Sequence, residues 1–275
     1  MKVLILGGDG YLGWPTTMHF ANEGHDVYAI DNLSKRKIES EYGVEPLNII
    51  KPFNERVKAW NLNQKNKIKH YVSDLLNYKV LCEILEEFTP NVIIHYAEQP
   101  SAPYSMASRE KAVFTQYNNV IGNLNLLFAI KKLCPEAHLI KLGTMGEYGT
   151  PNIDIEEGWL NIEHNGRKDK VLYPKKPGSF YHLSKVHDSA NIEFACRIWG
   201  LRCTDLNQGF VYGISTKEID LDYENLATSF HYDSIFGTVI NRFISQIASN
   251  IDMSVYGKGT QKRAFLNLID TINCV

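Results

Sequence analysis

Three glycines near the start of the chain have the spacing of a phosphate-binding turn. Gly7, Gly10 and Gly13 directly follow the apolar residues 3–6 and directly precede a helical pattern. In such a turn the first glycine permits a tight bend, the second lets the backbone approach a pyrophosphate, and the third allows close helix packing. The helix N-terminus adds unpaired N–H groups and a partial positive charge. This context predicts a dinucleotide site, and the alternative is a glycine turn without a ligand.

Carboxylates follow the next two apolar runs and could recognise the adenosine half of a dinucleotide. Asp31 can accept hydrogen bonds from ribose hydroxyls and would repel a 2′-phosphate, which favours NAD over NADP. Lys35 and Arg36 weaken this preference, because a cation could bind the extra phosphate. Asp74 is a candidate for the adenine edge, and its alternative role is to cap the helix that begins at Tyr78.

A tyrosine and a lysine four residues apart could supply acid–base chemistry. Tyr181 and Lys185 lie on one face if this segment is helical. The ammonium would lower the pKa of the phenol and hold a nicotinamide ribose, so that the tyrosine becomes a usable base. Thr144 follows the apolar residues 138–142 and could donate a hydrogen bond to the reacting sugar oxygen. Its alternative role is that of an ordinary strand-end hydroxyl.

These residues are spaced along an alternating series of expected strands and helices. Apolar, β-branched runs that predict buried strands occur at residues 3–6, 27–30, 68–72, 92–96, 138–142 and 201–206. Helical spacing lies between several of them, as in residues 79–88 and 113–133. Parallel strands need crossovers that cover both sheet faces. We therefore predict an α/β fold, a Rossmann-like doubly wound parallel sheet with a smaller C-terminal nucleotide-sugar-binding region.

The same pattern predicts two regions. Residues 1–186 form an NAD-binding Rossmann domain with part of the substrate pocket, and residues 187–275 hold the last strands and the nucleotide-sugar-binding region. The latter region draws on residues 148–173 and on residues from 213 onward. Apolar spacing continues to the last residue, so we expect a C-terminal truncation.

Three longer segments have a less regular pattern. Residues 33–67 are interpreted as a helical insertion near the cofactor mouth, and residues 225–250 as helical. Residues 253–275 predict a turn, a strand and the start of a helix.

The composition excludes several classes of protein. With 275 residues, 44% hydrophobic and 22% charged, the chain has the composition of an ordinary globular protein. A net charge of −2 without charge runs argues against nucleic-acid binding. The 5 cysteines are scattered, which argues against disulfides or a zinc site. Without a signal sequence or a long apolar stretch, we expect a cytoplasmic location and no membrane insertion.

Five longer strings resemble one family. They are HYAEQ (95–99), SAPYSM (101–106), TMGEYGTPN (144–152), SFYHLSKVHDS (179–189) and DLNQG (205–209). With the glycine turn and the Tyr181/Lys185 pair, they resemble the extended short-chain dehydrogenase/reductases that act on nucleotide sugars, and among these the UDP-sulfoquinovose synthases. The resemblance covers essentially the whole chain.

This resemblance implies a multistep reaction of UDP-glucose and sulfite with tightly held NAD. Tyr181 accepts the 4-hydroxyl proton while a hydride leaves C4, water is lost across C5 and C6, sulfite adds at C6, and the hydride returns to C4. The product is UDP-sulfoquinovose. We also expect a homodimer, and sulfite arrives either free or from a sulfite-donating partner protein.

The resemblance leaves the proton acceptor at C5 open. Ordinary 4,6-dehydratases carry Thr-Asp-Glu where this chain has Thr144, Met145 and Gly146. His182 can titrate near neutral pH and Glu147 lies on the same loop, so these two residues are the candidates. The alternative for His182 is a packed helix residue, and Met145 either shapes the pocket or belongs to the core.

One motif departs from the family pattern by the loss of a cation. Related sequences carry arginine after the Glu-Gln pair, whereas here Pro100 follows Gln99. An arginine would be a natural partner for the sugar diphosphate or an incoming anion. Arg109 and Arg263 are the candidates to replace it.

The resemblance implies three sets of site residues and no metal. The catalytic candidates are Thr144, Tyr181, Lys185, His182, Glu147 and Met145. The cofactor-binding candidates are Gly7, Gly10, Tyr11, Leu12, Gly13, Asp31, Asn32, Arg36, Asp74, Leu75, Ala97, Asn118, Tyr181, Lys185, Gln208 and Val211. The substrate-binding candidates are Gln99, Thr144, Thr238, Asn241, Tyr256, Gln261 and Arg263.

Other functions use much of the same machinery. A UDP-glucose 4-epimerase-like enzyme needs Thr144, Tyr181 and Lys185 but no elimination groups. Another nucleotide-sugar 4,6-dehydratase would stop before sulfite addition. A non-enzymatic NAD-sensing relative would keep the fold without turnover, and the intact Tyr181/Lys185 pair argues against it.

Overall fold

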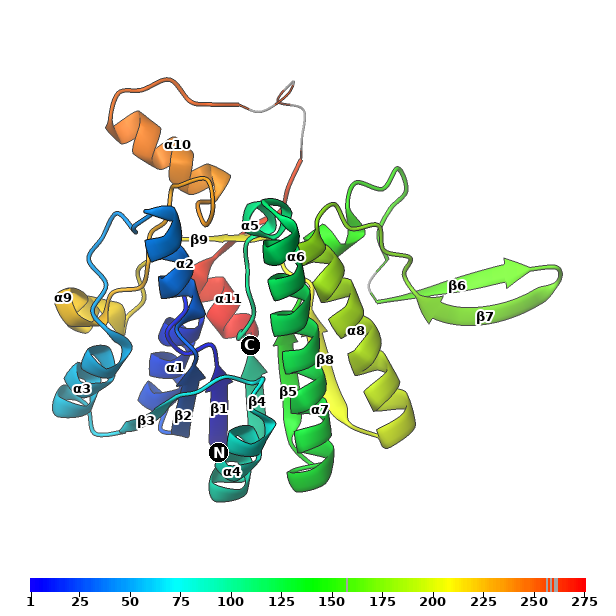
Figure 1. Cartoon of the computed structure of the whole chain (residues 1–275), viewed down its shortest axis with the longest axis horizontal. Helices are drawn as coiled ribbons and strands as arrows, with labels where there is room; N and C mark the ends of the chain where they lie inside the picture. The colour runs from blue at the N-terminus through cyan, green and yellow to red at the C-terminus, as the bar shows by residue number, and fades with distance from the viewer. Residues whose placement is uncertain (157, 256, 258, 260–261) are drawn as a thin grey trace.

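The centre of the structure is a parallel sheet whose described strands number six (Figure 1). The computed structural model describes residues 1–156, 158–255, 257, 259 and 262–275. The strands are β1 (Lys2–Leu6), β2 (Asp26–Asp31), β3 (Ile68–Val72), β4 (Val92–His95), β5 (His138–Leu142) and β8 (Arg202–Leu206). Their order is β3-β2-β1-β4-β5-β8, and each strand forms at a predicted run. Because the order reverses between β1 and β4, a crevice is expected at their carboxyl ends.

Helices cover both faces of the sheet, which confirms the doubly wound α/β fold. The helices before β8 are α1 (Gly13–Asn22), α2 (Ser34–Tyr42), α3 (Phe53–Asn63), α4 (Tyr78–Phe88), α5 (Ala102–Met106), α6 (Arg109–Gln116), α7 (Gly122–Leu133) and α8 (Phe180–Trp199). One core packs α4, α7 and α8 on the sheet, and the other packs α1 and α3 on the opposite face. Helices α2 and α3 confirm the predicted helical insertion.

The long helix predicted over residues 113–133 is interrupted by a wider turn. A π-helical segment, η1 (Tyr117–Ile121), joins α6 to α7 without a break in the chain direction. Such turns displace side chains from the regular helical positions and are frequent at functional sites. Here Asn118 and Asn119 are buried, and Asn118 lies at the edge of the cavity described below.

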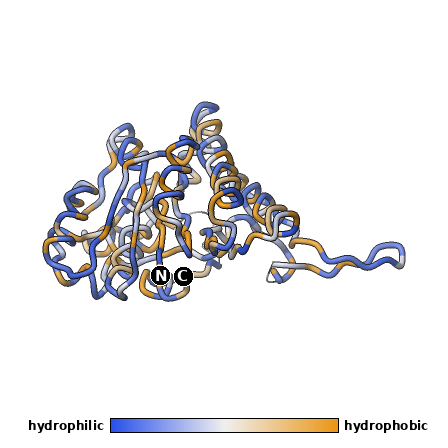
Figure 2. Tube along the Cα trace, turned by 90° about the horizontal axis from the view of Figure 1, so that it is seen from below, coloured by the Kyte–Doolittle hydropathy of each residue, from blue (hydrophilic) through white to orange (hydrophobic). Residues whose placement is uncertain are grey.

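A β-hairpin that the sequence reasoning missed projects from the body of the molecule in both views (Figures 1 and 2). It pairs β6 (Trp159–His164) with β7 (Arg167–Leu172). Asn165 and Gly166 both have positive φ, 49° and 72°, as in the two-residue turns that favour Asn-Gly. This Asn-Gly pair was the signal in the sequence. The hairpin contributes no lining residue to the described cavity, so the prediction that residues 148–173 as a whole form the sugar region is wrong for residues 159–172.

The C-terminal part is less helical than predicted. It contains β9 (Phe210–Tyr212), η3 (Ile219–Leu221), α9 (Tyr223–Leu226), α10 (Val239–Ala248), β10 (Phe265–Asn267) and α11 (Leu268–Cys274). The prediction of helix over residues 225–250 is wrong for residues 227–238, because side chains there bond the backbone instead. Asp233 accepts from the N–H groups of Ile235 and Phe236, both at 2.8 Å. The strand and helix predicted within residues 253–275 are confirmed as β10 and α11.

Among the described residues, no helix is both long enough and apolar enough to cross a membrane. The same residues contain no cluster of ligands suited to a metal ion.

The packing of the sheet predicts where the chain is sensitive to truncation of a side chain. Ile93 in β4 is fully buried, whereas Ile162 on the hairpin is 39% exposed. Ile93→Ala should lower the free energy of unfolding by about 2–5 kcal/mol, because it leaves a cavity in the core. Ile162→Ala should cost less than about 1 kcal/mol. Urea denaturation measures both values, and equal losses would contradict the description of the hairpin as peripheral.

Candidate active site

A cavity of about 820 Å³ lies over the carboxyl ends of the central strands. Its lining residues come from the glycine turn after β1, the chain after β2, β4 and β5, and the start of α8. Residues 208–211 and 229–241 close it from the C-terminal side. This volume lies within the range of small-molecule sites, and the position is the one expected of a switch-point crevice.

The glycine turn has the geometry that only glycine permits. Gly7 has a φ of 86°, and a Cβ atom on Gly13 would lie 1.9 Å from the Gly7 carbonyl oxygen. Gly7, Gly10 and Gly13 all line the cavity at the N-terminus of α1, as predicted for a pyrophosphate cradle. Tyr11 and Leu12 line it too, and the Tyr11 hydroxyl donates to the carbonyl of Gly213 at 2.6 Å.

Asp9, within this turn, binds the cation that was predicted to face the cofactor. Its carboxylate pairs with Arg36 and with the buried Arg56. Arg36 also donates to the carbonyl of Lys51 at 2.9 Å, and it does not line the cavity. The assignment of Arg36 to cofactor binding is therefore wrong, because a buried carboxylate needs its charge. Lys35 lines the cavity but pairs with Glu39.

Asp31 lies where a ribose could reach it. Its two carboxylate oxygens accept hydrogen bonds from the N–H groups of Asp9, at 2.9 Å, and Leu33, at 2.7 Å. Burial and the neighbouring Asp9 raise the pKa of Asp31 to about 6. The side chain still lines the cavity, and each oxygen has a further lone pair for a hydroxyl donor.

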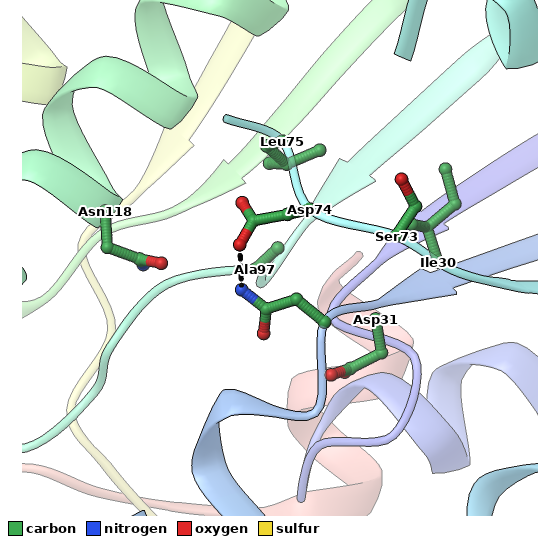
Figure 3. A pocket seen from close by; sticks show the side chains of 8 residues that line it. Ile30, Asp31, Ser73, Asp74, Leu75, Ala97 and Asn118 are labelled. Atoms are coloured by element: carbon green, nitrogen blue, oxygen red, sulfur yellow. Dashed lines mark hydrogen bonds between the residues drawn. The ribbon is translucent and has the colours of Figure 1, made fainter. Parts of the chain in front are cut away.

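A small pocket beside Asp31 brings together residues predicted for the adenosine end (Figure 3). Its lining residues are Ile30, Asp31, Asn32, Ser73, Asp74, Leu75, Ala97 and Asn118. Asn32 donates to Asp74 at 2.9 Å. The alternative role of Asp74 as a helix cap is wrong, because Asn77 caps α4 by accepting from the N–H of Val80. With the glycine turn, this pocket could hold the adenosine and pyrophosphate of a dinucleotide.

Thr144, Tyr181 and Lys185 line the cavity together, as the sequence predicted. Thr144 follows β5, and its hydroxyl oxygen accepts from the N–H of Gly146 at 3.2 Å, so its proton is free to donate into the cavity. Lys185 donates to the carbonyl of Leu142 at 2.7 Å. Its ammonium lies 5.8 Å from the centre of the Tyr181 ring.

Lys185 has a second partner that changes the expected chemistry. Its Nζ atom lies 2.6 Å from Oε2 of Glu98, a residue that follows β4 and also lines the cavity. Burial and the Glu98 charge raise the pKa of Tyr181 above its ordinary value. The prediction of a lowered Tyr181 pKa is wrong, because burial of the phenol and the charge of Glu98 outweigh the positive charge nearby.

The two candidates for the base at C5 occupy different environments. His182 lines the cavity, and its Nδ1 atom is 2.9 Å from the hydroxyl of Ser179. Burial and the charge of Lys185 lower the pKa of His182, which favours the neutral imidazole that can accept a proton. Met145 lines the cavity beside it.

Glu147 points away from the cavity. Its side chain is fully buried, pairs with Lys175 and accepts from the hydroxyl of Ser189 at 2.9 Å. It also accepts from the N–H of Thr144 at 3.3 Å and so closes a capping box around the turn η2 (Met145–Tyr148). The structure therefore gives Glu147 a role in holding the Thr144 loop and does not bring it to the reacting centre.

The predicted substrate residues are only partly brought together. Thr238, Asn241 and Arg263 line the cavity, as do the cofactor candidates Gln208 and Val211. Gln99 does not, because it is buried and donates to Thr115 at 2.8 Å. Arg109 begins α6 outside the lining set. Tyr256 and Gln261 lie outside the described residues.

Several lining residues were missed by the sequence reasoning. They are Glu98, Ser101, Thr150, Lys176, His231 and Phe236. Glu98 and Ser101 lie in strings that carried the family resemblance, directly after a strand, and that position was the available signal. The others lie on irregular segments whose path depends on tertiary contacts.

Comparison with known proteins confirms the resemblance. The model of the NAD dependent epimerase/dehydratase family matches residues 3–275. The chain is 50% identical to the chloroplastic UDP-sulfoquinovose synthase of Spinacia oleracea over 274 residues, which are 100% of this chain and 57% of the spinach protein. It is 41% identical to the UDP-sulfoquinovose synthase of Sulfolobus acidocaldarius, over 100% of this chain and 70% of that protein. The chain thus spans little more than half the length of the spinach relative.

A solved structure shares the fold. The UDP-glucuronic acid 4-epimerase of Bacillus cereus, solved in complex with UDP-glucuronic acid and NAD, superposes with a TM-score of 0.69. The two sequences are 20% identical, and the alignment covers 99% of this chain and 71% of the epimerase. On the family match and the two full-chain relatives, the chain belongs to the NAD dependent epimerase/dehydratase family.

Proposed function

We propose that the chain converts UDP-glucose and sulfite to UDP-sulfoquinovose, with NAD as the redox cofactor. The observation that carries this proposal is the 50% and 41% identity to two UDP-sulfoquinovose synthases over the whole chain. The cavity supports it, because Thr144, Tyr181 and Lys185 line one wall together with His182.

The described residues fit NAD in several respects. The glycine turn would hold the pyrophosphate, and the pocket of Asn32, Asp74 and Asn118 would hold the adenine. Asp31 would accept from the ribose hydroxyls, while the two cations that follow it in sequence, Lys35 and Arg36, are paired with Glu39 and Asp9. NAD is therefore preferred over NADP. When bound, NAD supplies a hydride acceptor for sugar C4 and later a hydride donor.

The sugar 4-hydroxyl would be handled by three side chains. Tyr181 accepts the hydroxyl proton as the hydride leaves C4, and it returns the proton when C4 is reduced again. Thr144 donates a hydrogen bond to the same oxygen. Lys185 would hold the cofactor ribose, and its positive charge would favour the phenolate form of Tyr181 that can accept the proton.

Oxidation at C4 makes the C5 proton acidic, because the carbanion next to a ketone is stabilised. The neutral imidazole of His182 accepts this proton, and the C6 hydroxyl takes up a proton and leaves as water. The sulfur lone pair of sulfite then forms a bond to C6, and C5 regains a proton. The balance is one UDP-glucose and one bisulfite consumed for one UDP-sulfoquinovose and one water.

Two cations in the described part of the cavity wall have no acidic partner within ion-pair distance, namely Lys176 and Arg263. Lys35 and Lys185 are paired with Glu39 and Glu98. We assign Arg263 to the sugar diphosphate, because its guanidinium can bind phosphate with two hydrogen bonds. Related sequences carry arginine where this chain has Pro100. Lys176 then supplies the positive charge that is missing at that position and attracts sulfite.

The homodimer, a sulfite-donating partner protein and a cytoplasmic location are further expectations that stay predictions. So does the absence of a nucleic-acid partner.

The proposal predicts a specific product and the exchange of the C5 hydrogen with solvent. With UDP-glucose, NAD and sulfite, the protein should form UDP-sulfoquinovose, identified by mass spectrometry. Substrate deuterated at C5 should lose its label to solvent, because the C5 proton must leave once C4 is a ketone. His182→Ala should slow this exchange and still form reduced nicotinamide. Complete retention of the label, with interconversion of UDP-glucose and UDP-galactose, would establish the epimerase alternative instead.

Removing one oxygen should separate binding from chemistry. Tyr181→Phe keeps the ring and its packing but removes the proton acceptor, so the rate of nicotinamide reduction by UDP-glucose should fall at least 10²- to 10⁴-fold. Calorimetric affinities for NAD and UDP-glucose should stay close to those of the wild type. Turnover near the wild-type rate would exclude Tyr181 as the base.

The assignment of Lys176 predicts an effect confined to sulfite. Lys176→Met should raise the KM for sulfite about 10- to 150-fold, since a charge-assisted contact contributes roughly 1.5–3 kcal/mol, and should leave C5 exchange without sulfite unchanged. Lys170→Met, on the exposed hairpin, is the matched control and should change neither quantity. An unchanged KM for sulfite in Lys176→Met would transfer the role to another cation.

A further inference from the structure

Behind the cavity wall lies a cluster of buried charges that the proposed reaction steps do not use. It consists of Glu98 after β4, Lys141 in β5 and Asp188 in α8, whose side chains are at most 2% exposed. The Lys141 Nζ atom lies 3.9 Å from Oε1 of Glu98 and 3.5 Å from Oδ2 of Asp188. Lys185 contacts the other oxygen of Glu98, so the cluster extends to the cavity surface.

This cluster is costly to bury. The Lys141 ammonium and both Asp188 carboxylate oxygens have no hydrogen-bond partner in the described protein, and the Glu98 oxygens form ion pairs without hydrogen-bond geometry. Buried groups of this kind are rare in native proteins, and replacing them with apolar side chains is often neutral or stabilising. The cluster is therefore not explained by stability, and its position against Lys185 indicates a role in the site.

We propose that Glu98 is a positioning residue, whose carboxylate fixes the Lys185 ammonium beside the Tyr181 ring and is itself held by Lys141, which pairs in turn with Asp188, and by His95, whose Nε2 atom lies 3.6 Å from Oε1 of Glu98. The proposal deepens the proposed function, because it rests on Tyr181 as the proton acceptor. The ammonium donates one hydrogen bond, to the carbonyl of Leu142, and is held on its other side by the ion pair with Glu98. Lys185 also lines the cavity, so the same ammonium can contact a ligand.

Burial raises the pKa of Tyr181, and the charge of Glu98 raises it further. Glu98 brings a negative charge close to the phenol and offsets the positive charge of Lys185. Lys141 acts in the opposite direction on Tyr181. Burial opposes the ionisation of Glu98, but Lys185 and Lys141 hold its pKa below the ordinary value. Burial and the charge of Glu98 raise the pKa of Asp188.

Titratable groups from five elements surround Lys185 and Tyr181, and the test has to separate the effects of these groups from that of Glu98. They are His95 from β4, Lys141 from β5, Glu147 from η2, His182, Lys185 and Asp188 from α8, and Asp205 from β8. None of the other groups in this list lies within ion-pair distance of Lys185 in the described protein, whereas Glu98 does. A change of charge at Glu98 should thus have the largest effect on the Lys185–Tyr181 pair.

The test is the ionisation of Tyr181 in the full chain without ligands. Protein with ¹³C-labelled tyrosine rings is titrated by NMR, and the Tyr181 signal is identified by its absence in Tyr181→Phe. In Glu98→Gln the midpoint should fall by about one to two pH units relative to the wild type, because a nearby negative charge is removed while the shape is kept. In Glu218→Gln, which removes a buried carboxylate beside α1, it should not move.

A double variant separates charge from packing. Glu98→Gln with Lys141→Met removes one charge of each sign, so the midpoint of Tyr181 should return toward the wild-type value. It also provides a measurable protein if the single variant does not fold. NAD affinity should fall several-fold in both variants, because Lys185 loses its anchor, and Glu98→Asp should restore the midpoint more than the affinity.

Two results would overturn the proposal. One is a Tyr181 midpoint in Glu98→Gln equal to that of the wild type, and the other is an equal shift in the Glu218→Gln control. Neither result depends on turnover, so they are distinct from a failure of the wild-type protein to form UDP-sulfoquinovose. That failure would remove the proposed reaction and leave the measured link between Glu98 and Tyr181 intact.

Discussion

A carboxylate inside a protein must be paired, and in this chain three such pairings hold the loops that form the cavity. Asp9 is paired with Arg56 and Arg36, which ties the glycine turn to α3 and α2. Glu98 is paired with Lys185 across the sheet crevice. Glu147 closes the capping box of the Thr144 loop. Each carboxylate follows a strand of the sheet, so the strand ends and the ion pairs together determine where the site lies.

These pairings decide which cations are left for ligands. Arg36 lies close to Asp31 in sequence, but Asp9 binds its guanidinium, and Glu39 binds Lys35. Lys175 is adjacent to Lys176 yet is bound to the buried Glu147. In the described cavity wall, Lys176 and Arg263 have no acidic partner within ion-pair distance, and neither lines the small pocket beside Asp31.

The fold and the cofactor end could be predicted from sequence because they depend on local patterns. The six strands, Gly7 to Gly13 and Asp31 are read from runs and spacings, and the parallel order brings them together. The pairing of Arg36 with Asp9 could not be predicted, since both residues carry the charge expected of ligand-binding groups. The inward orientation of Glu147 depends on Ser189 and Lys175, which are distant in the chain. The break within residues 225–250 has a local cause, the hydrogen bonds that Asp233 accepts from the backbone of Ile235 and Phe236.

The loop after β5 shows why the dehydratase acid–base pair and His182 exclude each other. A Cβ atom on Gly146 would lie 2.3 Å from Nε2 of His182, so any side chain at this position would displace the imidazole. Ordinary 4,6-dehydratases carry glutamate there, and this chain has glycine and a histidine that occupies the space. Within the proposed reaction, the base is thereby moved from the loop to the first turn of α8, where Ser179 orients it. Gly146 is conformationally unremarkable, with no positive φ, and its role is to leave room for that ring.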